Sequence, residues 1–303
     1  MSKRFLFTAL VLFAIIANIN STYAQKPRMY VKEFTKANEV SGDDYNKVRA
    51  AVISALNLTE RFELLDAATI SSIAEEEERR QSESAMHDET ARNEQKVTKA
   101  NNYILDGTVT ACTVKSNSKD GKTAFTCVLT YSLTVTDYAS NTTVASKKFD
   151  HSPTGLGGAL GKLLDESTSA EGAKTSAINS IKTDIENFLI EEFPLRGEIY
   201  AEDFVTKKDK VTHCYINLGS NVGVKNGDWF AIYEVQTKVG RTIEKEIGRL
   251  KVTEADEEIS NCKVTKGEKE VKKALDRYFE NIENDPDTKL LRIKSIPEPL
   301  LAF

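Results

Sequence analysis

The sequence predicts an α+β fold, in which a mixed β-sheet with helices packed on it precedes a small all-β unit. Helical and strand-like spacings of apolar residues alternate between residues 28 and 193. From residue 197 to Gly267 only short strand-like segments follow, separated by glycine-bearing turns. Pro194 and Gly197 lie between the two patterns and end the preceding helix, so we place the boundary there.

The first 24 residues have the features of a secretory signal peptide. Lys3 and Arg4 precede an apolar run from Phe5 to Ile19, and Thr22-Tyr23-Ala24 forms an acceptable cleavage site. A retained anchor helix is the alternative, although the run is short for a membrane span. No cysteine follows the run to accept a lipid. We therefore expect an exported protein, periplasmic or associated with the outer membrane, without stable membrane insertion by itself.

Each element of the first unit has a local signal. Apolar residues at helical spacing follow Ser41 and Asp43, either of which is a suitable N-cap. Residues 125–137 alternate strictly and predict a half-buried antiparallel strand, joined through a turn at Asp120-Gly121 to a strand at 101–114. The other expected elements are strands at 28–34, 61–66 and 142–149 and helices from residue 67 and over 173–193.

The glycine-rich stretch LGSNVGVKNGDWFAIYEV, residues 218–235, raises the question of a phosphate-binding loop. Such a loop feeds a helix N-terminus, whereas β-forming residues follow here and no GKS or GKT sequence is present. Asn226-Gly227 between apolar residues is instead typical of a hairpin turn. We therefore interpret the stretch as a turn in a small β unit. A charged helix is expected after Gly267, followed by a tail.

Charge and residue spacing disfavour several function classes. The net charge is -5, and removal of the signal peptide takes away two positive charges and leaves -7, which argues against a nucleic-acid partner. Neither His87, His151 nor His213 has metal-site spacing, and the acidic run at 75–78 is typical of a solvated helix end. We therefore predict no catalytic residues, no metal and no cofactor. A triad assembled from distant positions stays open.

Four cysteines, Cys112, Cys127, Cys214 and Cys262, suggest two disulfides in an exported chain, with four buried thiols as the alternative. Pairing within each expected unit joins Cys112 to Cys127 and Cys214 to Cys262. Cys127 lies on the apolar face of its strand, whereas Cys112 alternates with threonines. A β-bulge or a free thiol is therefore expected at the first pair.

Residues 28–193 resemble the CsgG-like family. The stretch RFELLDAATISSIAEEEE and the strand Tyr103-Ile104-Leu105-Asp106-Gly107-Thr108-Val109 match the family's strand-then-helix and strand-then-hairpin motifs. The resemblance implies an envelope assembly or secretion component that is not an enzyme. The chain lacks the lipobox cysteine of the lipid-anchored members, and its only strong candidate for a membrane hairpin, residues 125–137, is needed for the sheet.

Residues 197–267 resemble the C-terminal domain of flagellar assembly protein T, a small SH3-like β-barrel. Asn217-Leu218-Gly219-Ser220, Gly223-Val224, Asn226-Gly227-Asp228 and Ile247-Gly248-Arg249-Leu250-Lys251-Val252 carry this resemblance. The expected organisation is a signal peptide over 1–24, a CsgG-like unit over 25–196, an SH3-like barrel over 197–267, and a charged helix and tail over 268–303.

The expected function is a non-enzymatic adaptor that contacts a protein of the cell envelope. The alternatives are a homo-oligomeric, pore-associated secretion component of the curli-channel type and a hydrolase with an unrecognised site. Trp229, the only tryptophan, and Phe230 are the candidate partner-binding residues. Because side chains alternate along a strand, only one of them can face the barrel core. Because large aromatic side chains are mostly buried, we favour burial of both, one in the core and the other under residues 197–210 or the first unit, over an exposed anchor.

Overall fold

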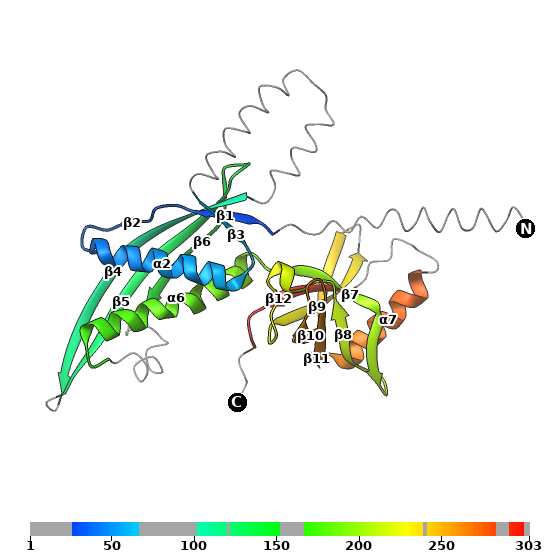
Figure 1. The fold of residues 1–303 in the computed structure, drawn as a ribbon. Helices are drawn as coiled ribbons and strands as arrows, with labels where there is room; N and C mark the ends of the chain where they lie inside the picture. The colour runs from blue at the N-terminus through cyan, green and yellow to red at the C-terminus, as the bar shows by residue number, and fades with distance from the viewer. Residues whose placement is uncertain are drawn as a thin grey trace, which may run out of the picture.

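The computed structural model describes residues 26–66, 102–119, 122–151, 167–238, 241–282 and 291–299. The expected signal peptide, the helix expected from residue 67 with its acidic run, and the turn at Asp120-Gly121 lie outside these residues. Within them the chain forms a mixed sheet with two helices, then a closed barrel with a third helix (Figure 1). This arrangement agrees with an α+β fold that carries a small barrel.

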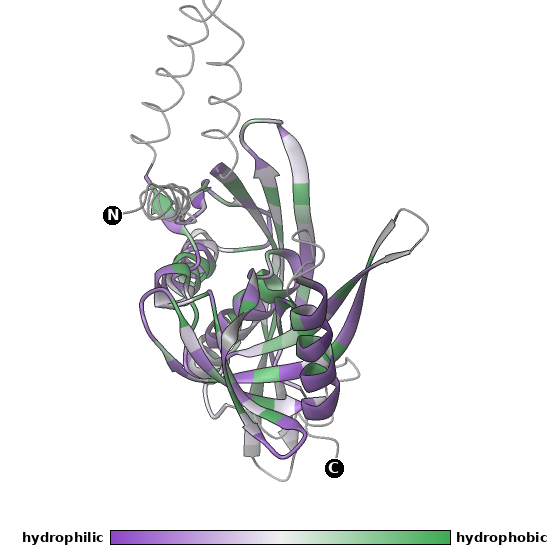
Figure 2. Ribbon diagram, turned by 90° about the vertical axis from the view of Figure 1, so that its right-hand side faces the viewer, coloured by the Kyte–Doolittle hydropathy of each residue, from purple (hydrophilic) through white to green (hydrophobic). Residues whose placement is uncertain are grey.

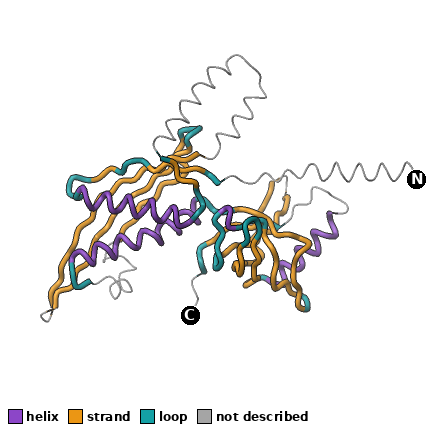
Figure 3. Tube along the Cα trace, viewed as in Figure 1, coloured by secondary structure: helices purple, strands orange, loops and turns teal. Residues whose placement is uncertain are grey.

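The first sheet has the strand order β3-β1-β4-β5-β6, and the short β2 pairs with β4. β1 runs parallel to β3 and β4, whereas β4, β5 and β6 are antiparallel, so the sheet is mixed. The helices α2 and α6 lie side by side along one face of the sheet (Figure 3). The bounds are β1 Arg28–Val31, β2 Thr35–Lys36, α2 Gly42–Thr59, β3 Glu63–Leu65, β4 Asn102–Lys119, β5 Lys122–Asp137, β6 Thr142–His151 and α6 Ala170–Glu192.

α2 begins after one of its two predicted N-cap residues, whereas α6 begins at Ala170, three residues before its expected start. The Ser41 hydroxyl accepts a hydrogen bond from the Asp44 backbone N–H at 3.1 Å, so Ser41 rather than Asp43 is the N-cap of α2. Ser169 caps α6 in the same way. Asp44 lies buried in the first turn of α2, where the Lys174 ammonium of α6 contacts both of its carboxylate oxygens at 3.0 and 2.8 Å. This pair joins the helices at one end.

The core of the first unit lies between the sheet and these helices. Alternation along β5 places Leu129, Tyr131, Leu133 and Val135 at 0% exposure, as the sequence pattern predicts. Their main partners on the helices are Val48, Val52, Leu56, Ile181, Ile185, Phe188 and Leu189. A register shift between Val109 and Ala111 on β4 adds one residue opposite β5. Because a one-residue insertion reverses the facing of the residues after it, Cys112 turns to the core side.

The second sheet is a closed antiparallel barrel in the order β10-β11-β8-β7-β12-β9. Its core holds buried residues from all of the described strands of the barrel, and the amphipathic helix α7 adds Val271, Ala274 and Leu275 (Figure 2). The bounds are β7 Arg196–Lys207, β8 Lys210–Ile216, the 3-10 turn η1 Ser220–Val222, β9 Trp229–Lys238, β10 Arg241–Ala255, β11 Ser260–Lys266, α7 Glu268–Ile282 and β12 Arg292–Ile296.

Two expectations about this region are corrected by the structure. Asn226-Gly227 forms a turn, but not a hairpin turn, because β8 and β9 on either side of it are not paired with each other. The segment after Gly267 is not only a helix and tail, because β12 lies between β7 and β9 and closes the barrel. Closure needs a strand from 25 residues or more beyond β11, and local spacing carries no signal of such a distant pairing.

Among the described residues, no helix combines the length and the apolar character that a membrane span requires.

Candidate interaction site at the junction of the sheet and the barrel

The C-terminal end of α2 packs on the turn that precedes β9. Gly223 has a φ of +87°, and a Cβ added there would lie 2.7 Å from the Thr59 carbonyl oxygen and 3.0 Å from Arg61 Cγ. The Lys225 ammonium donates a hydrogen bond to the Leu58 carbonyl oxygen. Carbonyls in the last turn of a helix lack helical partners and attract cations. Lys225 therefore provides both a hydrogen-bond donor and a positive charge at the C-terminal end of α2. The glycine-rich stretch thus joins the two units.

The buried Arg61 and the half-buried Asp228 lie near this junction and act on each other's charge. Arg61 is 8% exposed, and its Nη1 has no hydrogen-bond partner within the described part of the chain. Burial lowers the pKa of Arg61, and the charges of Asp228 and Glu186 act against this effect. Burial likewise raises the pKa of Asp228, although the Lys225 N–H and Arg61 act to lower it. Burial therefore disfavours the charged form of each group, and the opposite charge offsets part of that effect.

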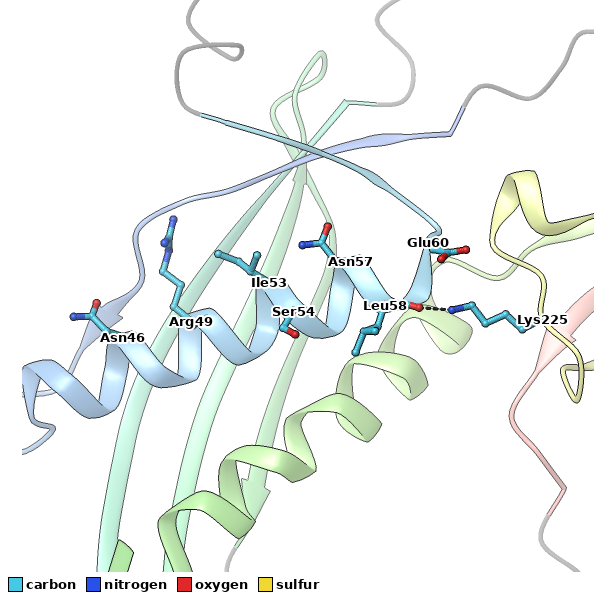
Figure 4. Close-up of a pocket in the computed structure, with 9 residues that line it drawn as sticks. Asn46, Arg49, Ile53, Ser54, Asn57, Leu58, Glu60 and Lys225 are labelled. Atoms are coloured by element: carbon cyan, nitrogen blue, oxygen red, sulfur yellow. Dashed lines mark hydrogen bonds between the residues drawn. The ribbon is translucent and has the colours of Figure 1, made fainter. Parts of the chain in front are cut away.

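A groove of about 650 Å³ opens beside the junction, along the outer side of α2. Arg49, Ile53 and Asn57 recur at helical spacing and project from one side of α2, while Lys225 reaches over from the barrel (Figure 4). Leu58 lies at the junction end and is 51% exposed. The groove is lined by Asn46, Arg49, Ala50, Ile53, Ser54, Asn57, Leu58, Glu60 and Lys225.

Arg49 is held in place in this groove rather than extended into solvent. Its guanidinium donates to the backbone carbonyls of Val31 and Lys32 at 3.1 and 3.0 Å and pairs with Glu33 at 3.2 Å. These bonds tie α2 to the end of β1. The groove therefore has a fixed polar wall and an apolar end at Leu58, which is the composition of a protein-binding surface.

The structure separates the two candidate partner-binding aromatics. Phe230 is fully buried in the barrel core, so it packs the fold and does not present a surface. Trp229 points to the outer side and is half-buried, between Lys251 on β10 and Ile296 on β12. The Lys251 ammonium lies 5.2 Å from the centre of the Trp229 ring. The indole N–H is buried and has no hydrogen-bond partner among the described residues.

All four cysteines are free thiols in this structure, and each expected pair lies on neighbouring strands. Cys214 is directly opposite Cys262, and both are buried in the barrel core. Cys112 and Cys127 are offset by two residue pairs, because Cys112 is opposite Leu129 and Cys127 is opposite Val114. The sequence-based disulfides stay a prediction.

Burial and mutual contact set the reactivity of these thiols. A hydrogen bond from Cys127 lowers the pKa of Cys112, whereas the same contact, together with burial, raises the pKa of Cys127. Burial alone raises the pKa of Cys214 to about 12. Because the thiolate is the reactive form, burial disfavours reaction of Cys214 in the folded barrel.

The structure brings together one group that the sequence did not predict. His151 at the end of β6 lies 2.5 Å from Asp184 of α6, which also accepts a hydrogen bond from the Tyr131 hydroxyl at 2.7 Å. The Ser180 hydroxyl lies 3.4 Å from both ring nitrogens and donates to the Ala177 carbonyl at 2.7 Å. No pattern in sequence links residues on separate elements, and their meeting is decided by packing of α6 on the sheet.

The His151 group differs from a nucleophile relay in its geometry. In such a relay the acid binds one ring nitrogen and the nucleophile binds the other. Here Asp184 binds Nε2, and Ser180 is equally distant from both nitrogens. The hydrogen bonds of this group therefore join α6 to β5 and β6 of the sheet. Within the described ranges, no three His, Cys, Asp or Glu side chains gather in a metal-binding group.

No protein-family model matches the sequence, and no curated protein matches it. Solved structures match at low identity: the PelC dodecamer from Paraburkholderia phytofirmans is 13% identical over 52% of this chain and 89% of its own, with a TM-score of 0.25. A hypothetical protein from Chlamydia trachomatis is 10% identical over 55% and 99%, with a TM-score of 0.30. A lipoprotein from Neisseria meningitidis is 13% identical over 52% and 99%, with a TM-score of 0.25. These likenesses carry no conclusion about function.

Proposed function

We propose that this protein is an exported, non-enzymatic adaptor for cell-envelope assembly or secretion, in which a CsgG-like unit and an SH3-like barrel together present a protein-binding surface. The observation that supports it is the groove beside α2. It joins an exposed leucine to a polar wall, and both units contribute to it. The sequence motifs of both resemblances, and the signal peptide expected from the first 24 residues, support the envelope location.

The surface has the features of a partner site in which one apolar side chain anchors the contact. Leu58 is among the most exposed large hydrophobic residues described, and it lies beside Lys225 and Glu60. An apolar anchor surrounded by polar groups that exclude water is the usual arrangement of an interface hot spot. Because Lys225 holds the end of α2, the position of the barrel fixes the shape of this surface.

Capture from envelope extracts tests the proposal with a matched pair of variants. Leu58→Gln removes the anchor, and Val144→Gln changes a comparably exposed residue, 44% against 51%, on the distant strand β6. We expect Leu58→Gln to lose the captured envelope protein while Val144→Gln and the parent retain it, with thermal stability equal in all three. Equal capture by all three proteins contradicts the proposal.

A homo-oligomeric secretion component is a second candidate, favoured by the open edge of the first sheet. β6 is an edge strand of that sheet among the described elements, and edge strands can pair with another chain. Lys147 and Lys148 on β6 oppose such pairing, since charged side chains protect edges. Light scattering of the eluting protein separates the candidates: a ring of many copies favours the pore-associated component, and a monomer favours the adaptor.

A hydrolase is a third candidate, favoured by the contact of His151 with Asp184 and Ser180. Assays against ester, amide and glycoside substrates test it with the Ser180→Ala variant. Turnover that is lost in Ser180→Ala would support hydrolysis by this group. Turnover that survives the substitution would assign the activity to another site or to a contaminant.

A further inference from the structure

The outer face of the barrel carries three pairs of like-charged residues directly opposite each other on neighbouring strands. Arg196 on β7 is opposite Lys294 on β12, and on β10 and β11 Arg249 is opposite Lys266 and Lys251 is opposite Lys263. We call these six residues the basic strip. Arg196, Lys263 and Lys266 are exposed, and the other three are half-buried.

The basic strip is continuous across five neighbouring strands. The barrel places β7, β12, β9, β10 and β11 side by side in that order. On β9, Ala231 is opposite both Lys294 and Arg249, and Trp229 is opposite Lys251. The short side chain of Ala231 lies between the longer side chains of Lys294 and Arg249. Because these are five of the six strands of a closed barrel, the strip curves around the outside of the barrel rather than running straight across one flat face.

The charges of the basic strip are only partly neutralised. Arg249 pairs with Glu246 at 2.9 Å, and Lys251 lies 3.9 Å from Glu298. Among the described residues, the other four cations make no ion pair, although Glu198 follows Arg196 on the same side of β7. The strip is therefore positive, whereas the whole chain carries a net charge of -5.

Like charges directly opposite each other on neighbouring strands destabilise a sheet, because they repel at close range. None of the six side chains fills the barrel core, and among the described residues only Arg249 and Lys251 make an ion pair or a cation–π contact that offsets this repulsion. An anionic partner would convert this repulsion into attraction on binding. The arrangement thus indicates a binding surface rather than a structural one.

A hollow of about 330 Å³ adjoins the β7 and β12 end of the basic strip. Arg196, Lys294, Arg292 and Tyr233 contribute to its lining, and the Arg292 guanidinium pairs with Glu244 at 2.9 Å. Glu198 and Glu244 also line the hollow, so its lining holds two carboxylates beside its three cations.

We propose that the basic strip binds an acidic, extended segment of the adaptor's partner protein. This proposal rests on the proposed adaptor function and adds the chemistry of the partner. Anionic lipid fits the face less well, because the indole N–H of Trp229 is buried and the ring is held against Lys251, so it cannot insert into a bilayer. The acidic chain as a whole also disfavours a nucleic acid.

Trp229 supplies a direct readout, because it is the only tryptophan of the chain and lies within the strip. Its fluorescence is titrated with poly-L-glutamate at low salt. The strip variant Lys263→Gln, Lys266→Gln, Lys294→Gln removes three unpaired cations. The control variant Lys115→Gln, Lys148→Gln, Lys182→Gln removes the same charge from the first unit.

We expect saturable binding by the parent that weakens at least about tenfold in the strip variant and by less than about twofold in the control. Added salt should weaken parent binding, and the Tm of the strip variant should be no lower than that of the parent, because repulsion is relieved. Equal weakening in both variants, no binding by the parent, or binding only to phosphatidylglycerol vesicles would overturn the proposal.

The results that would refute the basic strip proposal differ from those that would refute the adaptor function. If the parent ignores poly-L-glutamate while capture still depends on Leu58, only the basic strip proposal fails. If poly-L-glutamate binds but no envelope protein is captured, the adaptor function fails.

Discussion

Substitution of Gly223 by alanine is expected to disturb the junction between the two units, and Gly227 provides a matched control four residues away. Both glycines have positive φ, +87° and +97°, so each alanine meets the same backbone strain of about 1–2 kcal/mol. Only the Gly223 substitution also meets the other unit. Its Cβ would lie 2.7 Å from the Thr59 carbonyl oxygen, whereas nothing lies within 4 Å of a Cβ at Gly227.

The Gly223 contact is well short of the 3.4 Å at which ordinary van der Waals contact begins, and the atom it meets is backbone. The end of α2 must therefore move, and overpacking of this kind costs about 1–3 kcal/mol. We expect a total loss of about 2–5 kcal/mol for Gly223→Ala, against about 1–2 kcal/mol for Gly227→Ala. The difference between the two losses in the free energy of unfolding measures how tightly Gly223 packs against the end of α2.

Urea denaturation followed by two signals is the assay. Trp229 fluorescence reports on the barrel, and far-ultraviolet circular dichroism reports mainly on the helices. In the parent and in Gly227→Ala the two transitions should coincide, since the units are joined. In Gly223→Ala they should separate. An equal loss of stability in both variants, with coincident transitions, would refute a tight junction between Gly223 and Thr59.

Three further predictions concern packing, charge and oxidation. Phe230→Ala should cost about 3–5 kcal/mol in urea denaturation, because the ring is fully buried, and a loss below about 1 kcal/mol would contradict its core role. Burial acts to raise the pKa of Asp44, but hydrogen bonds from Lys174 and Ser41 and the charges of Lys174 and Lys47 together lower it. The stability from this pair is therefore present above the ordinary pKa of 3.8 and lost as pH falls through the lower folded value. The stability gap between the parent and Lys174→Met should therefore close below about pH 4. A bridge between Cys214 and Cys262 would add about 2–4 kcal/mol, and free thiols in non-reduced periplasmic material would contradict it.

The candidate site could be predicted only in part from the sequence. The glycine stretch was recognisable as a turn, because β-forming residues and not a helix follow it. Its contact with Arg61 was not predictable, because the two segments are more than 150 residues apart and share no periodic signal. The groove also depends on which side of α2 the sheet leaves uncovered, and that is decided by packing of α6.

Trp229 and Phe230 also show which features the sequence predicts and which depend on the tertiary structure. Alternation implied that only one of Trp229 and Phe230 faces the core, and Phe230 does. The sequence could not say what surrounds Trp229, because its neighbours Lys251 and Ile296 come from strands that pair only in the closed barrel. The same closure gathers the cations of the basic strip, which are scattered over four strands.

Local physical chemistry by itself determined the elements of this protein. Helix caps such as Ser41, the strict alternation along β5 and the positive φ of Gly223 and Gly227 depend on residues within one short segment. Only the tertiary structure decided the register and the meeting of distant elements. The bulge that turns Cys112 inward, the strand β12 that closes the barrel and the contact of His151 with Asp184 are of this kind. The physical reason is that a pairing between distant segments is stabilised by burial and hydrogen bonds that exist only after the chain has closed.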